Sequence, residues 1–241
     1  MRPRFLIDRP PSGAATVPLP ADEAHHAQHV LRLGTGDEVR VFDGAGREWD
    51  ARIVIAGARG VAVEIGRGID PVREPAVHVT LCAAWLRGDQ MDDVVRDATA
   101  LGVAAIVPIA SDRVAVSKRA RRGDADALRW RRVAVAAARQ CGRAVVPAIE
   151  APAPFAAALE APDAGALIFC VEPDHATAAA APAGRPDRAR LFVGPEGGWS
   201  DAEVAEAIRR GARLLSLGPR TLRASLAPLV ARAALWTEWG W

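Results

Sequence analysis

Two short segments of this 241-residue chain have the composition of ligand-binding loops. The first is GPEGG at residues 194–198, and the second is LGPRTLR at residues 217–223. Because glycine has no Cβ atom, a ligand can approach the main chain closely there and bind its amides and carbonyls. The alternative is purely structural, since glycine and proline also mark tight connections between a strand and a helix.

Each loop lies between an apolar run and a helical segment. Ser200 and Glu203 have the spacing of a capping box, which predicts a helix that begins at Asp201. Gly211 is placed to end that helix. The first loop should therefore be short and held between two well-defined elements. After the second loop, Ser225 is the predicted N-cap of the last helix.

The larger part of the chain alternates between apolar runs of strand length and helical segments. The runs stand at residues 76–85, 103–109, 166–172, 190–194 and 212–218. Continuous apolar strands separated by helices indicate an α/β fold with a mostly parallel sheet covered on both faces. Ligands of such sheets bind at the carboxyl ends of the strands, where both glycine-rich loops are expected.

The N-terminal part follows a different pattern. Residues 38–42, 47–56 and 61–66 read as short strands joined by the turns DGAG and GARG. Strands at that spacing predict a small antiparallel β-barrel. Glycine and proline in GRGIDPVREP break the pattern, so we place the boundary near residues 67–75. This gives a first domain over residues 1–70 and a second over residues 71–241.

The positive charge is concentrated in one segment. The net charge is only +2, but residues 113–143 hold ten Lys or Arg against two Asp, a local balance of +8. Nearly all of these cations are guanidinium groups, which suit phosphate contacts. If residues 126–141 form one helix, Arg129, Arg132 and Arg139 share a face. That face would suit a phosphate backbone, and a solvated charged surface is the alternative.

Composition also excludes several classes of protein. The three cysteines Cys82, Cys141 and Cys170 are an odd number at wide spacing, which argues against a disulfide framework and a zinc site. The first residues lack an apolar stretch of signal-peptide length, and no segment approaches the roughly 20 apolar residues of a membrane span. We therefore expect a cytoplasmic protein.

Two further clusters have both a binding and a packing interpretation. The first cluster consists of His25, His26 and His29. A metal site would need a further ligand such as Asp, Glu or Cys clearly placed nearby, so we expect instead a helix that faces solvent or RNA. The second cluster consists of Trp236, Trp239 and Trp241. These side chains could stack on bases, but a terminal helix that packs in a dimer interface is favoured.

Five motifs in sequence order resemble those of one family. They are HHAQHVLRLGTGDEVRVFDGAG at 25–46, RGDQMDDVVRDATALGVAAIVPI at 87–109, RWRRVAVAAARQCGR at 129–143, GPEGGWSDAEV at 194–204 and LGPRTLR at 217–223. Together they resemble the RsmE-type 16S ribosomal RNA uridine N3-methyltransferases, of the SPOUT class. The resemblance covers nearly the whole chain. It implies a PUA-like barrel that binds RNA, followed by a trefoil-knot methyltransferase domain, in a homodimer whose site is completed across the interface.

The resemblance also implies a cofactor, S-adenosylmethionine, held among three knot loops. Its expected contacts are Cys170, Val171 and Glu172, then Gly194, Pro195, Glu196, Gly197 and Gly198, and finally Leu217, Gly218, Pro219, Leu222 and Arg223. Glu196 could instead cap the neighbouring turn. The expected RNA contacts are His25, His26, Arg32, Arg113, Arg129, Arg132, Arg139 and Arg143.

The implied reaction occurs on the Watson–Crick edge of uracil, so the base must be unpaired or flipped out of a helix. A sulfonium already activates the methyl group, so no metal is required. No His, Asp or Glu stands out as a general base. Arg220 and Arg223 are the candidate catalytic residues, as electrostatic clamps for the uracil anion or a phosphate. The alternative for Arg220 is a contact to a helix end or an interface carboxylate.

The chain differs from the usual family pattern at two places. Where the family usually has K-x-x-E-L-G, residues 97–102 read DATALG, with Asp97 and Ala100 at the two charged positions. After Leu222 and Arg223 the family usually has T/A-E-T, and this chain has Ala224, Ser225 and Leu226. Two alternatives to the leading function therefore remain: an RNA-binding paralogue without catalysis, and a methyltransferase with another RNA target.

Overall fold

The computed structural model describes residues 2–8, 10, 15–57, 60–86, 88–114, 123–161, 165–173 and 184–240. The chain forms two compact units. The first consists of Met1–Arg73 with Val135–Val146, and the second of Glu74–Ala134 with Pro147–Trp241. The first unit thus includes a segment that lies far along the chain from the rest of it.

The first unit contains a five-stranded sheet in the order β1-β3-β4-β5-β2. Its strands are β1 (Arg4–Leu6), β2 (Thr16–Pro18), β3 (Glu38–Phe42), β4 (Glu48–Gly57) and β5 (Gly60–Ile69). The pairs β3–β4, β4–β5 and β2–β5 are antiparallel, whereas β1 joins β3 in parallel. The antiparallel strands predicted over residues 38–66 are confirmed. β1 and β2 were not predicted, because three residues are too few to show an alternating pattern.

One side of this sheet carries a short helix, α1 (Ala21–His25), which continues as a π-helical turn, η1 (His26–Val30). The core beneath it is built from alternate strand residues that point inward, including Val39 and Val41 of β3, Ile53 of β4 and Val63 of β5. These side chains are almost fully buried. Their burial is the physical reason for the period-two pattern seen in the sequence.

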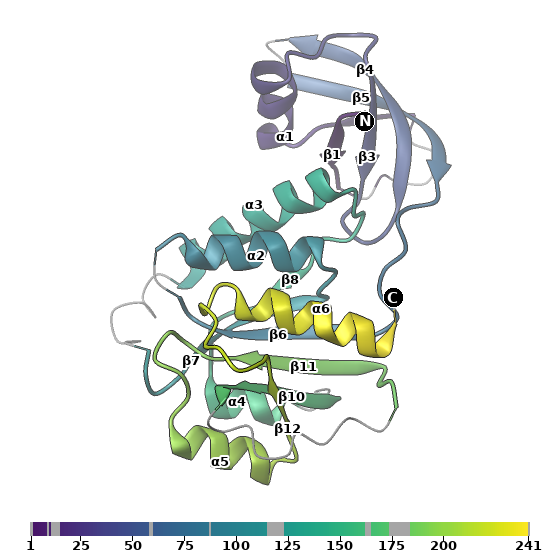
Figure 1. Ribbon diagram of the computed structural model, residues 1–241. Helices are drawn as coiled ribbons and strands as arrows, with labels where there is room; N and C mark the ends of the chain where they lie inside the picture. The colour runs from purple at the N-terminus through teal and green to yellow at the C-terminus, as the bar shows by residue number, and fades with distance from the viewer. Residues whose placement is uncertain are drawn as a thin grey trace. The chain divides into compact units, whose positions relative to one another are not determined.

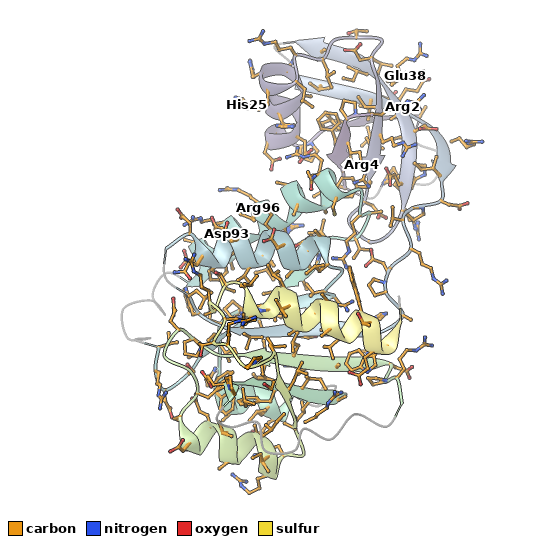
Figure 2. All side chains as sticks on the ribbon, in the orientation of Figure 1. Arg2, Arg4, His25, Glu38, Asp93 and Arg96 are labelled. Atoms are coloured by element: carbon orange, nitrogen blue, oxygen red, sulfur yellow. The ribbon has the colours of Figure 1, made fainter. Side chains whose placement is uncertain are left out.

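Arg4 ties β1 to the C-terminal part of α3 (Gly123–Cys141) within the first unit. Its guanidinium forms a bidentate, buried ion pair with Glu48, with both N–O distances at 2.8 Å. It also donates to the carbonyls of Ala138, Arg139 and Arg143, and these are groups that a helix end leaves without partners. Figure 2 shows Arg4 on β1 among the side chains of this unit.

The second unit is a parallel α/β sheet in the order β12-β10-β11-β6-β7-β8, with β9 also paired to β7. Every pairing among its described strands is parallel. The strands are β6 (His78–Ala84), β7 (Ala105–Ala110), β8 (Ala148–Ile149), β9 (Ala153–Pro154), β10 (Ala166–Val171), β11 (Arg188–Val193) and β12 (Arg213–Ser216). The predicted parallel sheet is confirmed. The two-residue strands β8 and β9 were not predicted.

Helices cover both faces of this sheet (Figure 1). One face packs against α4 (Phe155–Glu160) and α5 (Asp201–Arg209), through a core that includes Phe155, Phe169, Phe192 and Trp199. The other face is covered by α2 (Gln90–Ala100) and α6 (Ala227–Trp239), which contact each other. The β10 strand lies between β11 and β12, so the loops that follow these three strands leave the same edge of the sheet.

The helix ends test the local predictions. Ser200 caps α5 in a capping box with Glu203, and Gly211 lies in the left-handed region at φ +77°, so both predictions for this helix are confirmed. The predicted cap of the last helix is wrong. The N-cap of α6 is Leu226 and not Ser225, because the amides of residues 226 and 227 both bond to the Arg223 carbonyl and complete a turn before the helix begins.

Among the described residues, no helix is long and apolar enough to cross a membrane.

Candidate active site

The loops after β10, β11 and β12 line a pocket at the carboxyl edge of the sheet. The pocket is lined by Cys170, Val171, Glu172, Pro173, Val193, Gly194, Pro195, Trp199, Leu217, Gly218, Arg220, Thr221, Leu222, Ala224 and Ala227. The three loops expected to form one site therefore meet around a single pocket.

Most of the predicted cofactor residues line this pocket. The eight that do are Cys170, Val171, Glu172, Gly194, Pro195, Leu217, Gly218 and Leu222. The five that do not are Glu196, Gly197, Gly198, Pro219 and Arg223. The lining also includes residues that were not predicted as cofactor contacts: Val193, Trp199, Thr221, Ala224 and Ala227. Trp199 stands directly after GPEGG, and a large apolar residue at the end of a glycine-rich loop was the signal that could have found it.

Gly198 shapes the pocket indirectly. Its backbone is in the left-handed region at φ +69°, which favours glycine, and a Cβ atom there would collide with the Glu172 carboxylate. Glycine at this position thus leaves room for a charged side chain that lines the pocket. Gly197 has a different neighbour, because its carbonyl accepts a hydrogen bond from the Arg113 guanidinium. A Cβ atom at Gly197 would contact Arg113 and not the pocket.

Among the described residues that line the pocket, only Glu172 and Arg220 carry charge. Arg220 is exposed at the edge of the pocket, as a residue that meets a substrate from outside would be. Arg223 is exposed but does not line the pocket, and its carbonyl forms the turn that precedes α6. The two candidate catalytic arginines therefore occupy different positions.

The Cys170 thiol is not a reactive group. It is buried, and burial raises its pKa to about 12. Since the thiolate is the nucleophilic form of cysteine, this side chain is neutral and inert near pH 7. Cys170 contributes packing and its main chain to the pocket wall.

A neighbouring loop is joined to the start of α5. The backbone N–H of Asp112, just after β7, donates to Glu203 at 3.0 Å. The Ser200 hydroxyl donates to the Asp112 carboxylate at 2.6 Å. Together with the bond from Arg113 to Gly197, these contacts hold the glycine-rich loop through two residues that do not line the pocket.

Three of the predicted RNA contacts lie in the second unit: Arg113, Arg129 and Arg132. Arg129 is paired with Asp89 and Asp92, at 2.6 and 2.5 Å. Arg132 is exposed, and no ion pair links it to another described residue. Of the three, Arg132 therefore has the guanidinium that is most available to a phosphate.

The other five predicted RNA contacts lie in the first unit: His25, His26, Arg32, Arg139 and Arg143. Arg32 is exposed at the end of η1, and its backbone adopts φ 56°, which is uncommon for a residue with a side chain. His25 lies on α1, where Figure 2 labels it, and its ring is 4.7 Å from that of His29. Burial lowers the pKa of His26, and the nearby Arg139 and His25 lower it further. This imidazole is therefore uncharged at neutral pH.

Arg139 and Arg143 do not belong to an exposed basic face, although the sequence predicted one. Arg139 pairs with the buried Glu23 at 3.2 Å. Arg143 is only 5% exposed, so its guanidinium is enclosed by the protein. Lys118, Arg119, Arg121 and Arg122 of the basic segment lie outside the described residues, as does Trp241. Trp239 is buried within the single chain.

The two parts of the chain match two known domain families. Residues 73–236 match the RNA methyltransferase domain, and residues 19–66 match the RNA methyltransferase PUA domain. The chain is therefore an RNA methyltransferase with a PUA domain.

Individual relatives narrow this class. "Ribosomal RNA small subunit methyltransferase E" of Synechocystis sp. is 34% identical over 227 residues, which cover 92% of this chain and 73% of that protein. The structure of the protein with the same name from Neisseria gonorrhoeae, bound to S-adenosylmethionine, is similar at a TM-score of 0.89 and 31% identity, over 99% of this chain and 98% of that one. A methyltransferase from Legionella pneumophila, also solved with this cofactor, has a TM-score of 0.90 and 27% identity over 99% and 98%.

The chain belongs to the RsmE-type family of RNA methyltransferases. The resemblance seen in the sequence is thereby confirmed, as is the SPOUT-class fold preceded by a PUA-like barrel.

Proposed function

We propose that this protein transfers a methyl group from S-adenosylmethionine to N3 of a uridine in 16S ribosomal RNA. The observation that carries the proposal is the single pocket formed by the three loops after β10, β11 and β12, in a chain of the RsmE-type family. Relatives that share nearly the whole fold bind S-adenosylmethionine.

The residues present fit this cofactor. The pocket has an apolar wall of Val171, Val193 and Trp199, and its carboxylate, from Glu172, is opposite in charge to a sulfonium and an ammonium. Gly194 and Gly218 also line the pocket, and no other atom lies within 4 Å of where a Cβ atom of Gly218 would be, so a ligand can approach the main chain closely there. The cofactor supplies a methyl group that its sulfonium already activates.

The protein must then position the base and favour loss of the N3 proton. Arg220 lies at the pocket edge, where its positive charge would stabilise the uracil anion and so lower the pKa of N3. Arg223 is placed to hold a neighbouring phosphate, since it is exposed and lies outside the pocket lining. Neither role requires a metal ion.

The same proposal assigns a role to each domain and predicts where the enzyme acts and how it assembles. We assign RNA binding to the barrel over residues 1–70 and catalysis to residues 71–241, in a cytoplasmic enzyme that acts on the small ribosomal subunit or its RNA. A homodimer is supported by Leu226 and Val230, which are apolar, exposed by 44% and 36%, and next to or on α6. A second copy would cover them and complete the site beside Ala227.

Mass spectrometry of nucleosides tests the proposed reaction. Ribosomal RNA from cells that lack this protein should contain less 3-methyluridine in its 16S fraction, and the wild-type chain should restore it. A 16S fraction with unchanged 3-methyluridine would overturn the proposal.

The second candidate, an RNA-binding paralogue without catalysis, is favoured by one observation. The acidic residue usual in the family after the second glycine-rich loop is replaced by Ser225, and this serine does not cap α6. If that residue is indispensable, the purified protein will bind S-adenosylmethionine and RNA without turnover. Ser225→Glu combined with Leu226→Thr would then restore methylation, whereas turnover by the wild type excludes this candidate.

A further inference from the structure

Trp199 makes a contact that joins two of the loops around the pocket. Its indole Nε1–H donates a hydrogen bond to the Cys170 carbonyl at 2.9 Å. The side chain is only 2% exposed and stacks on Phe169, with ring centroids 4.6 Å apart. Phe155 approaches the same ring at 5.3 Å. The donor is therefore held in place by aromatic packing on the side away from the pocket.

The hydrogen bond lies where the pairing between β10 and β11 ends. The β10–β11 pairing runs as far as Phe169 and Phe192, and Cys170 is the next residue on β10. Beyond this point Cys170 and Val193 both line the pocket, so the pocket opens between the diverging ends of the two strands. The Trp199 indole thus connects the loop after β11 to the end of β10, at a residue that still pairs with β12 but no longer with β11.

Gly194 makes this arrangement possible. A Cβ atom on Gly194 would lie 3.0 Å from Cε2 and 3.1 Å from Nε1 of Trp199, closer than side chains normally pack. The indole can therefore reach Cys170 only because residue 194 has no side chain. The sequence suggested that this glycine leaves room for a ligand, and the structure adds that it leaves room for Trp199.

We propose that Trp199 is a positioning residue for cofactor binding. Its indole N–H fixes the carbonyl of Cys170, and with it the end of β10 and the residues Glu172 and Pro173 that follow, against Gly194 and Pro195. The pocket then has its binding shape before a ligand enters, which lowers the entropy lost on binding. This inference rests on the proposed function, because it takes S-adenosylmethionine as the ligand of the pocket.

Trp199→Phe tests the proposal, since phenylalanine keeps an aromatic ring in the cluster and removes only the donor. The affinity of the purified variant for S-adenosylmethionine, measured by calorimetry, should fall about tenfold or more. Hydrogen exchange at the amides of Val171 and Glu172 should become faster without ligand. Phe155→Leu is the matched control, because Phe155 belongs to the same aromatic cluster but neither lines the pocket nor donates to Cys170.

The control separates positioning from packing. Phe155→Leu should lower the melting temperature and leave cofactor affinity within about twofold of wild type. Wild-type affinity in Trp199→Phe would overturn the proposal, as would equal losses of affinity in the two variants. If the wild type itself does not bind S-adenosylmethionine, the proposed function fails. Faster exchange at Val171 and Glu172 in Trp199→Phe alone would still support the positioning role.

Discussion

At the scale of single residues, two charges define the chemistry of the pocket. Glu172 is held beside Gly198, where only glycine leaves room for it, and Arg220 lies at the exposed edge. The negative charge of Glu172 suits a cationic cofactor, and the positive charge of Arg220 suits an anionic base. The two roles can be distinguished by experiment, because Glu172 should affect cofactor affinity and Arg220 should affect the rate of reaction.

We expect Glu172→Gln to weaken binding of S-adenosylmethionine about tenfold and binding of S-adenosylhomocysteine less. The first ligand carries a sulfonium that the second lacks, and glutamine keeps the shape of glutamate without its charge. Calorimetric titration with both ligands measures the difference. Glu196→Gln, outside the pocket lining, should change neither affinity. Equal losses for the two ligands would show that Glu172 acts as a neutral hydrogen-bond acceptor.

Arg220→Ala should lower kcat about a hundredfold with little effect on cofactor affinity. A preorganised charge that stabilises an anionic transition state is worth on the order of 3 kcal/mol. Single-turnover assays on small-subunit RNA or particles measure this loss. Arg223→Ala should mainly raise the KM for RNA, because Arg223 does not line the pocket. A kcat unchanged in Arg220→Ala would remove that residue from the reaction.

At the scale of elements, buried charged side chains connect the segment 135–146 to β1 and α1 within the first unit. Arg4 and Glu48 both have side chains about 3% exposed, and Arg4 also binds carbonyls at the end of α3. Glu23 of α1 accepts hydrogen bonds from Arg139 and from the Leu6 amide. These pairs hold elements that are distant in sequence, so their loss should affect stability more than activity.

Arg4→Met should destabilise the protein by about 3 kcal/mol or more, because it leaves the Glu48 carboxylate buried without its partner. Arg40, 4.0 Å from Glu48, would compensate only weakly. Denaturant unfolding measures the change. Arg2→Met is the control, since Arg2 is exposed and forms surface pairs with Glu38 and Asp50. Its effect should stay below about 1 kcal/mol. Similar small effects in both variants would contradict the structural role of Arg4.

Glu23 should make stability depend on pH in a defined direction. Burial raises its pKa above the usual 4.5, although Arg139 and the Leu6 amide partly offset this. The folded state then binds the proton more strongly than the unfolded state. The contribution of Glu23 to the free energy of unfolding therefore falls as pH rises from 4.5 through the raised pKa.

Glu23→Gln removes this titration. The unfolding free energy of the wild type minus that of the variant, measured by denaturant at a series of pH values, should fall as pH rises from 4.5 through the raised pKa. Above that pKa the difference should stay constant. A difference that grows in favour of the wild type with rising pH would mean that the attraction of Arg139 outweighs burial.

At the scale of the whole molecule, the predicted RNA contacts are divided between the two units and differ in availability. Arg32 and Arg132 are exposed, whereas Arg129 and Arg139 already have carboxylate partners and Arg143 is buried. A charge in the sequence is therefore not equivalent to a charge that RNA can reach.

Arg132→Ala should weaken RNA binding and reduce its dependence on salt by roughly one unit of slope, the amount expected for one lost phosphate contact. Arg129→Ala should reduce the slope less, because RNA would compete with Asp89 and Asp92 for that guanidinium. Filter binding at several salt concentrations measures both slopes. Equal slopes in the wild type and Arg132→Ala would assign this arginine to a solvated surface.

Features that depend on neighbouring residues in the chain could be predicted from the amino-acid sequence. The alternation in residues 38–66 reflects strands with one buried face, and the apolar runs after residue 75 reflect strands buried on both faces. The capping box at Ser200 is local for the same reason. The two glycine-rich loops were also found in this way, because glycine acts through the conformation of its own backbone.

Contacts between side chains that are distant in the sequence could not be predicted, because they form only when the chain folds. Trp199 reaches Cys170 across 29 positions, Arg4 reaches Ala138 across 134, and Arg139 reaches Glu23 across 116. No periodicity records such contacts, because they depend on which strands become neighbours in the sheet and which helix packs beside them. The basic segment shows the consequence: its composition is evident in the sequence, but folding determines which of its arginines carboxylates neutralise, which the core encloses and which remain exposed.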